Sequence, residues 1–368
     1  MKTIVITDGK YRSAISAART LGRAGLRVVV TQTRGDTRVE PPVFSSRYAA
    51  ETIWIEGSAS DEAYPERLRE VLCRFERPVL FCVGAASLNA VSRDRAAFET
   101  CCDMLIAPPE VLDALNDKAV VHARAEALGL PVPKEYHGAP EAFPVVIKPH
   151  CGEKFGLKAA QRYRIADDAA SYEAALAELR QYDPDPIVQE KITGAGRGVS
   201  LLLDREGRLV DAICHRRVRE YPITGGPSAC CETIYDPALI DRAYRLLQSF
   251  GFTGLAMVEF KGERILEVNP RVWGSFPLTT CAGSQMAVKY AAAAAGEPVD
   301  YVPQDYAVGL RMRFVLNDTL ATLRLLAAGR VREACAGAAD VFCAKEALYD
   351  RDDPKPFRAY LKTTVLGK

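Results

Sequence analysis

The sequence lacks the patterns that mark several common classes of protein. Lys plus Arg (48) nearly balance Asp plus Glu (47) over 368 residues, so no overall field favours a nucleic acid. No apolar run approaches the about 18 residues of a membrane-spanning helix. The eleven cysteines never occur as CxxC and the four histidines are scattered, which argues against a disulfide framework and a zinc site. We therefore expect a cytoplasmic protein with reduced thiols, and neither a nucleic acid nor a membrane as partner.

The N-terminal MKTIVITDGK has no small-residue cleavage site, so it predicts a first strand and not a signal peptide.

Two nucleotide-binding motifs are also missing. The turn that follows the first strand lacks GxGxxG, which argues against a dinucleotide, and the glycine-containing loop after Lys148 lacks GxxxxGK[ST]. The first turn does place Lys10, Arg12 and Ser13 at a helix N-terminus, which favours a carboxylate or phosphate; a solvated turn is the alternative.

Short apolar segments alternate with helical patterns over the first 107 residues or so. The expected strands are at 3–7, 27–31, 52–55, 78–83 and 104–107. The expected helices are at 13–23, 61–75 and from about 87. This order predicts a parallel, doubly wound α/β domain.

The rest of the chain predicts further strands and helices in a less regular order. Strands are expected at 144–148, 186–192, 199–204, 209–221, 229–235 and 308–314, and helices at 110–115, 167–181, 237–250 and 284–296. In the tail, Asn317 or Asp318 is expected to cap a helix over 318–328, followed by a second helix, a strand near 340–344 and a helix from about 355. The tail carries no motif with an assignable chemistry, and we expect it to pack against a sheet or to support a dimer.

The stretch from Gly254 to Ser275 predicts a hairpin with three oxygen ligands. If the turn is three residues long, over 261–263, Glu259 shares a face with Glu267 and Asn269. A two-residue turn would send Glu259 to the other face. Two carboxylates and an amide suit Mg²⁺, usually bound together with nucleotide phosphates. An ordinary hairpin with surface acids is the alternative.

Two lysines precede this hairpin at positions suited to phosphate. Lys118 lies in the first turn of a helix that Asn116 or Asp117 can cap. Lys148 ends an apolar strand before a loop bracketed by Gly152 and Gly156, where backbone N–H groups and the ammonium can face an anion. For Lys118 alone, a surface charge is the alternative.

These motifs, in this order, resemble those of a known superfamily. Lys118, then VVIKP, VQEKI, MVEF and LEVNPR, resemble the ATP-grasp enzymes, and among them the carboxylate–amine ligases similar to the carbamoyl phosphate synthetase and biotin carboxylase branch. The resemblance covers roughly residues 1–300. It implies an N-terminal α/β domain (1–108), an ATP-grasp central lobe (109–186), a C-terminal lobe with the Mg–ATP site (187–300) and an extension (301–368).

The resemblance also implies roles for residues. Lys118 and Lys148 would touch the phosphates or base of ATP, Arg271 would face the γ-phosphate, and the loop over 151–156 would close over the phosphates. The adenine would meet, largely through backbone groups, Gln189, Glu190, Lys191 and Ile192. Mg²⁺, or Mn²⁺ in its place, would be held by Glu259, Glu267 and Asn269. Two departures are a GAGRGVS segment with no ribose-binding acid and a phosphate loop that contains Glu153 and Lys154.

The favoured function is an ATP-dependent ligase. A substrate carboxylate would be activated as an acyl phosphate and coupled to an amine, with Lys148, Arg219 and Arg271 as catalytic groups. Arg219, with the loop 225–228, is expected to orient the substrate carboxylate; a surface cation is the alternative. A small-molecule kinase on the same fold and a non-catalytic ATP-binding protein are the other readings. The partners are small carboxylates and amines and a possible second subunit, and no cluster selects a particular substrate.

Overall fold

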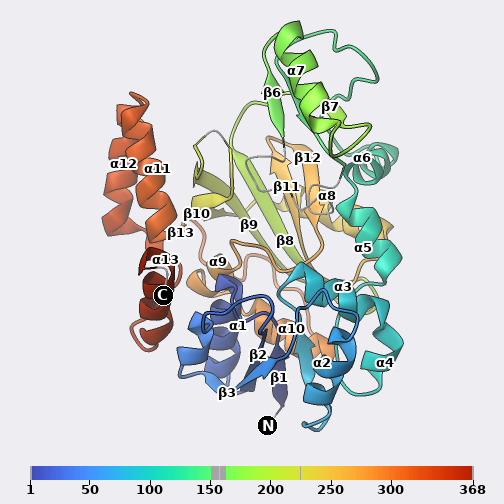
Figure 1. Cartoon of the computed structure of the whole chain (residues 1–368), viewed down its shortest axis with the longest axis vertical. Coiled ribbons are helices and arrows are strands. Elements are labelled where there is room, and N and C mark those ends of the chain that lie inside the picture. Colours follow the sequence, from blue (N-terminus) through green and yellow to red (C-terminus); the bar gives the residue numbers. More distant parts are fainter. Residues whose placement is uncertain (1, 151–156, 158–162, 224, 367–368) are drawn as a thin grey trace.

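The computed structural model describes residues 2–150, 157, 163–223 and 225–366 (Figure 1). Its N-terminal part contains a four-stranded parallel sheet in the order β3-β2-β1-β4. The strands are β1 (Thr3–Ile6), β2 (Arg27–Thr33), β3 (Ala49–Ile55) and β4 (Val79–Phe81). The helices are α1 (Arg12–Arg23), α2 (Tyr64–Leu72), α3 (Ala85–Arg93) and α4 (Arg95–Glu99), with a 3₁₀ turn, η1 (Pro42–Ser45). Strands β1 and β4 are buried throughout, as their continuous apolar runs predict, and the doubly wound α/β fold is confirmed.

The strand expected at 104–107 does not form. Asp103 makes an isolated parallel bridge with Val79. Beyond it, the N–H of Leu105 donates to the hydroxyl of Tyr290 at 3.2 Å. The segment is buried as its apolar residues predict, but a side chain takes the place of the neighbouring strand.

A small antiparallel sheet with one covering helix stands at one end of the molecule (Figure 1). Its order is β6-β5-β7, from β5 (Val145–Lys148), β6 (Arg164–Ala166) and β7 (Ile187–Glu190). Helix α7 (Ala169–Leu179) packs against it around a core that includes Val145, Ile147 and Leu179. Helices α5 (Pro109–Asn116) and α6 (Lys118–Ala127) precede it in the chain. Asp117 caps α6, as predicted, by accepting from the N–H groups of Ala119 and Val120.

The central element is a seven-stranded mixed sheet in the order β12-β11-β8-β9-β10-β13-β14. The strands are β8 (Gly196–Leu203), β9 (Leu209–Glu220), β10 (Ser228–Ile234), β11 (Gly254–Lys261), β12 (Arg264–Asn269), β13 (Arg311–Arg313) and β14 (Lys345–Glu346). The helices that follow its strands are α8 (Pro237–Ser249), α9 (Pro277–Cys281) and α10 (Met286–Ala294). Within the described ranges, no helix has both the length and the apolar character needed to cross a membrane.

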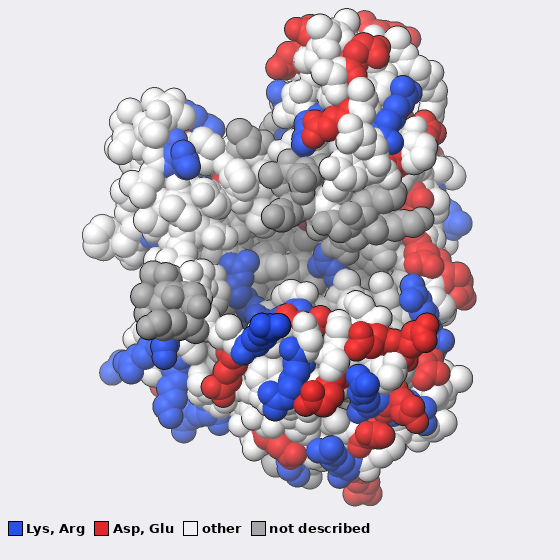
Figure 2. All heavy atoms as spheres, in the orientation of Figure 1, with Lys and Arg blue, Asp and Glu red and all other residues white. Residues whose placement is uncertain are grey.

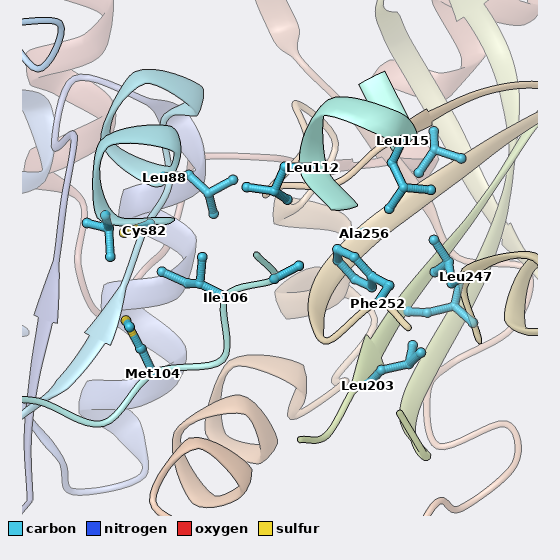
Figure 3. Packing of buried hydrophobic residues seen from close by; sticks show 14 of the residues in the cluster. Cys82, Leu88, Met104, Ile106, Leu112, Leu115, Leu203, Leu247, Phe252 and Ala256 are labelled. Atoms are coloured by element: carbon cyan, nitrogen blue, oxygen red, sulfur yellow. The ribbon is translucent and has the colours of Figure 1, made fainter. Parts of the chain in front are cut away.

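One hydrophobic core joins the N-terminal domain to the large sheet (Figure 3). Cys82 and Leu88 come from the first domain, Leu112 from α5, and Leu203 and Ala256 from the large sheet. Because the core is continuous, the two parts are packed against each other and not merely linked. The boundaries at 108, 186 and 300 stay predictions.

Ion pairs anchor the C-terminal extension to the large sheet. The extension contains α11 (Val315–Ala327), α12 (Val331–Cys343) and α13 (Lys355–Leu366). Arg219 of β9 donates at 2.7 Å to Asp318 of α11 and at 2.7 Å to Asp340 of α12, and all three side chains are buried. The predicted start of α11 was therefore wrong: the helix begins at Val315, and Asp318 lies within its first turns as an ion-pair partner. The strand expected near 340–344 lies slightly later in the chain, at Lys345–Glu346 (β14), because α12 continues to Cys343.

Removal of Arg219 should destabilise the protein because it leaves two buried carboxylates short of a counter-charge. For Arg219→Ala we expect the free energy of unfolding to fall by about 3 kcal/mol. The matched control is Arg216→Ala on the same strand; its partner is Glu232, its side chain is 47% exposed, and the expected loss is below about 1 kcal/mol. Urea unfolding measures both, and equal losses would contradict a structural role for Arg219.

Candidate active site

The predicted acid pair forms, but through a different hairpin geometry. The turn has two residues, Gly262 and Glu263, because Lys261 pairs with Arg264; the three-residue turn was wrong. Glu259 nevertheless lies directly opposite Glu267, since the register shifts between Glu259 and Phe260 and leaves Leu266 as an extra residue of β12. This β-bulge restores the shared face that the short turn alone would have removed.

A histidine of α6 holds the bulge in place. Nε2 of His122 lies 3.1 Å from the carbonyl oxygen of Leu266, which can only accept, so Nε2 carries the proton. Nδ1 then accepts from Nε2 of Gln189 on β7 at 2.9 Å. His122 has no counterpart in the sequence-based site, and its role depends on contacts that bring 122, 189 and 266 together.

Two lysines face Glu267. Nζ of Lys118 lies 3.2 Å from a carboxylate oxygen of Glu267. Lys148 is 9% exposed, and burial, with Lys118 nearby, lowers its pKa to about 8 although Glu267 and Glu135 act in the opposite direction. Burial alone would raise the pKa of Glu267, but Lys118 and Lys148 hold it well below its ordinary value. The structure thus brings together three residues that sequence analysis placed in one site.

Glu259 has its own counter-charge in Arg217 of β9. The guanidinium of Arg217 bonds a carboxylate oxygen of Glu259, and Glu259 raises the pKa of Arg217. Burial raises the pKa of Glu259, with Arg217 opposing and Glu267 adding to the rise. Arg217 was missed, because its position depends on β8 lying between β9 and β11.

Glycines of β8 make room for that arginine. A Cβ added at Gly196 would lie 3.0 Å from Cδ of Arg217, and one at Gly198 would lie 2.4 Å from the His215 ring. Burial, together with Arg217, lowers the pKa of His215 to about 3, so its ring is neutral at pH 7. Arg217 of β9 therefore lies across β8 and reaches Glu259 of β11. The Gly-Arg-Gly sequence at 196–198 is the signal that could have indicated this.

Asn269 and Arg271 complete the cluster. Nδ2 of Asn269 donates to Glu259 at 3.2 Å, and its Oδ1 accepts from Nη2 of Arg271 at 3.3 Å. Arg271 also donates to the carbonyl oxygen of Val272 at 3.2 Å. The predicted ligand set and the predicted arginine are thus neighbours.

The donor chemistry of this cluster fits Mg²⁺. Two carboxylates face each other across β11 and β12, and the amide of Asn269 lies beside them with its nitrogen on Glu259 and its oxygen on Arg271; carboxylate and amide oxygens are hard donors. Within the described residues, no group of three or more His, Cys, Asp or Glu side chains is placed to hold a metal by itself. A metal here would therefore need Asn269 or phosphate oxygens in addition to the two acids.

The segment expected to meet adenine forms strand β7 and its exit. Gln189 is buried, and the backbone N–H of Glu190 donates to the carbonyl oxygen of Lys134 at 2.9 Å. Lys191 is exposed and its N–H donates to Pro144 O at 3.3 Å, while Ile192 lies just beyond the strand. The loop with Gly152, Glu153, Lys154 and Gly156 lies outside the described residues.

Arg219 does not join this cluster. A register shift between β9 and β10 makes Val218 an extra residue and breaks the alternation that would put Arg219 beside Arg217. Its guanidinium pairs with Asp318 and Asp340 and lies outside the cluster, so the predicted catalytic role of Arg219 does not fit the structure. It is not a surface cation either, since it is buried.

The residues of the turn after β1 that could bind an anion make contacts within the protein. The guanidinium of Arg12 lies 3.8 Å from the ring centroid of Phe314, and Ser13 donates its hydroxyl proton to Trp273 O at 3.1 Å. Nζ of Lys10 is 3.9 Å from a carboxylate oxygen of Asp36. An anion site at this turn stays a prediction.

Figure 2 shows that this face of the molecule is hollowed between the end that carries α7 and the N-terminal part, with basic side chains at the edge of the hollow. A basic edge suits an anionic ligand.

Comparison with known proteins bears on the fold. Residues 183–315 match the model of a family described as ATP-grasp in the biosynthetic pathway with Ter operon. The chain is similar to biotin carboxylase from Campylobacter jejuni, solved as a β-γ-ATP complex, with a TM-score of 0.61 and 15% identity over 84% of this chain and 74% of that one.

Two further structures are similar. One is the biotin carboxylase domain of 2-oxoglutarate carboxylase from Hydrogenobacter thermophilus, a dimer with MgADP, ADP and bicarbonate, with a TM-score of 0.63 and 14% identity over 84% of this chain and 73% of that one. The other is L-amino acid ligase from Bacillus licheniformis, with a TM-score of 0.58 and 13% identity over 79% of this chain and 74% of that one. Together with the family match, these likenesses identify the chain as a protein of the ATP-grasp fold.

Proposed function

We propose that the protein is an ATP-dependent ligase that joins a carboxylate to an amine. The observation that carries the proposal is the contact between Lys118 of α6 and Glu267 of the hairpin at 3.2 Å, with Lys148 beside them. It joins, in one charged cluster, segments whose motifs resemble those of ATP-grasp ligases. The similarity to a biotin carboxylase and an L-amino acid ligase supports the same class of chemistry.

In the proposed reaction, an oxygen of the substrate carboxylate attacks the γ-phosphorus of ATP, and ADP leaves. The amine nitrogen then attacks the acyl carbon, phosphate leaves, and the nitrogen loses a proton. Phosphoryl transfer needs mainly positioning and neutralisation of charge. Lys118, Lys148 and Arg271 would neutralise phosphate charge as fixed donors.

The acid cluster would serve the metal. Glu259, Glu267 and Asn269 would hold Mg²⁺, or Mn²⁺, which supplies positive charge to the phosphates when bound. Arg217 holds the carboxylate of Glu259 in position and opposes the rise in its pKa that burial causes. Backbone groups of 189–192 would meet the adenine, and the 151–156 loop would cover the phosphates. We also propose a cytoplasmic location, since every cysteine within the described ranges is free.

The test is release of ADP and phosphate with crossed panels of carboxylates and amines, followed by analysis of the products. The ligase proposal requires release that depends on both substrates, with an amide as the product. A stable phosphorylated compound, formed without an amine, would show a kinase. ATP binding without turnover across the panels would support a binding protein.

Loss of the Glu267 charge should stop turnover and leave the fold intact. For Glu267→Gln we expect kcat to fall about 100-fold or more, because a charged group at the phosphates is removed, while the thermal midpoint stays near that of the wild type. The control is Glu263→Gln in the turn of the same hairpin, whose side chain is 69% exposed. Near-normal ADP release by Glu267→Gln at saturating Mg²⁺ would show that the metal assignment is wrong.

ATP binding should weaken as pH rises through the pKa of Lys148, about 8. Below that pH the ammonium is already charged, so binding takes up no proton; above it, binding must take up one, and affinity falls roughly tenfold between pH 7 and 9. Calorimetry in buffers of different ionisation enthalpy measures affinity and proton uptake together.

Lys148→Met should bind ATP more weakly at pH 7 and lose this pH dependence. Lys134→Met, at a side chain that is 57% exposed, is the control and should keep it. The assignment of Lys148 fails if its removal changes neither the affinity nor the proton uptake.

A further inference from the structure

The hairpin of α11 and α12 exposes an unusual amount of apolar surface. Its inward-facing residues include Ala321 and Leu325 of α11 and Ala334 of α12. Its exposed large hydrophobic residues are Leu320, Leu323, Leu326, Val331, Val341 and Phe342, of which Phe342 is 91% exposed. In Figure 1 the hairpin stands at one side of the large sheet. A concentration of exposed apolar side chains marks an interaction surface.

Four of these residues, all but Leu326 and Val341, belong to two regularly spaced stripes, and the spacing indicates what kind of partner covers them. Leu316, Leu320, Leu323 and Ala327 of α11 follow one another at intervals of four, three and four residues. Val331, Cys335, Ala338 and Phe342 of α12 repeat the same intervals. This is the spacing at which helices pack in left-handed bundles. Each helix therefore presents a stripe suited to another helix.

The two stripes differ in size in a complementary way. The α11 stripe is built on leucines, whereas the middle of the α12 stripe has the small residues Cys335 and Ala338. A two-fold axis that runs between the helices and parallel to them would place α11 of one copy on α12 of another, antiparallel. Leucines would then meet small residues in both halves, and alternation of large and small residues is how helical layers interdigitate.

The residues that would meet also lie at the same height along the two helices of the hairpin. Gly337 lies against Thr322, because a Cβ there would be 2.4 Å from the threonine hydroxyl oxygen. Leu323 is therefore level with the Cys335–Ala336 turn of the neighbouring helix. The acids that would attract a basic partner, Asp318 and Asp340, are turned inward to arginines of the sheet. Neither of these two acids is therefore available to a basic partner at the exposed face.

We propose that this face binds the same face of a second copy of the chain, so that the two hairpins form a four-helix bundle. Each helix has 13 residues, so two helices present a face of about 20 by 20 Å. Two such faces amount to about 800 Å² before the relief of the side chains is counted, which approaches the about 1,200 Å² at the lower end of the range for stable interfaces. This inference is independent of the proposed ligase activity.

Sedimentation velocity of the full chain tests it. The wild type is expected to dimerise at micromolar concentration. The double variant Leu320→Glu, Leu323→Glu is expected to dimerise at least 100-fold more weakly, with an unchanged circular dichroism spectrum, because both side chains are exposed in the single chain. The control is Val302→Glu, Val308→Glu, at two exposed valines outside the hairpin. A wild type that stays monomeric at 100 µM, or a dimer that the double variant leaves intact, would overturn the proposal.

Cross-linking tests the arrangement. Leu323→Cys should form a covalent dimer through Cys335 of the partner when oxidised with copper phenanthroline, since a disulfide needs Cα atoms within about 7 Å. The variant Leu323→Cys, Cys335→Ser should not. Both variants carry Cys73→Ser and Cys343→Ser as well, because these cysteines are also exposed. If the second variant then cross-links equally well, α11 packs on α11 of the partner and the proposed arrangement is wrong.

Discussion

A single extra residue, Leu266, keeps Glu267 opposite Glu259 in the two strands of the hairpin. The two-residue turn would otherwise turn one acid to the far face. His122 donates to the carbonyl oxygen of Leu266 and accepts from Gln189, so α6 and β7 both hold the bulge. The pairing of the two acids therefore depends on elements that are distant in the sequence, and the small sheet and the large sheet meet at the same point.

Because the two acids face each other, nearby positive charges must balance their negative charges. Like charges directly opposite each other in a sheet repel, and here both carboxylates are shielded from most solvent. Lys118 and Lys148 compensate Glu267, and Arg217 compensates Glu259. A group of perturbed carboxylates and ammonium groups is typical of functional sites, although ion-pair networks that serve structure perturb pKa values in the same way. The network of Arg219, Asp318 and Asp340 is of that second kind.

Sequence reasoning succeeded where local pattern decides structure. Alternating apolar runs and helical periods predicted the N-terminal sheet. The two acids and the amide do share a face as expected, but a bulge puts them there and not the three-residue turn on which the expectation rested. Sequence reasoning failed where contacts between distant residues decide the local structure. The turn length was wrong because the hairpin contains a bulge that His122 holds. Arg219 was misplaced because β9 bulges at Val218 and the C-terminal extension covers the arginine. Arg217 could not be found without knowing that β8 separates β9 from β11.

The glycines at 196 and 198 make room for Arg217 to reach Glu259 from two strands away, and this requirement can be tested on other sequences. In the antiparallel register, Gly198 pairs with Glu259 on one side and with His215 on the other. A larger residue at Gly198 would collide with the ring of His215, and one at Gly196 would force the side chain of Arg217 to shift. We therefore expect relatives that place an arginine against the acid equivalent to Glu259 from two strands away to carry small residues on the strand between. A search for Gly-x-Gly followed by His-x-Arg on the next strand would separate these relatives from ones that balance the same acid by other means.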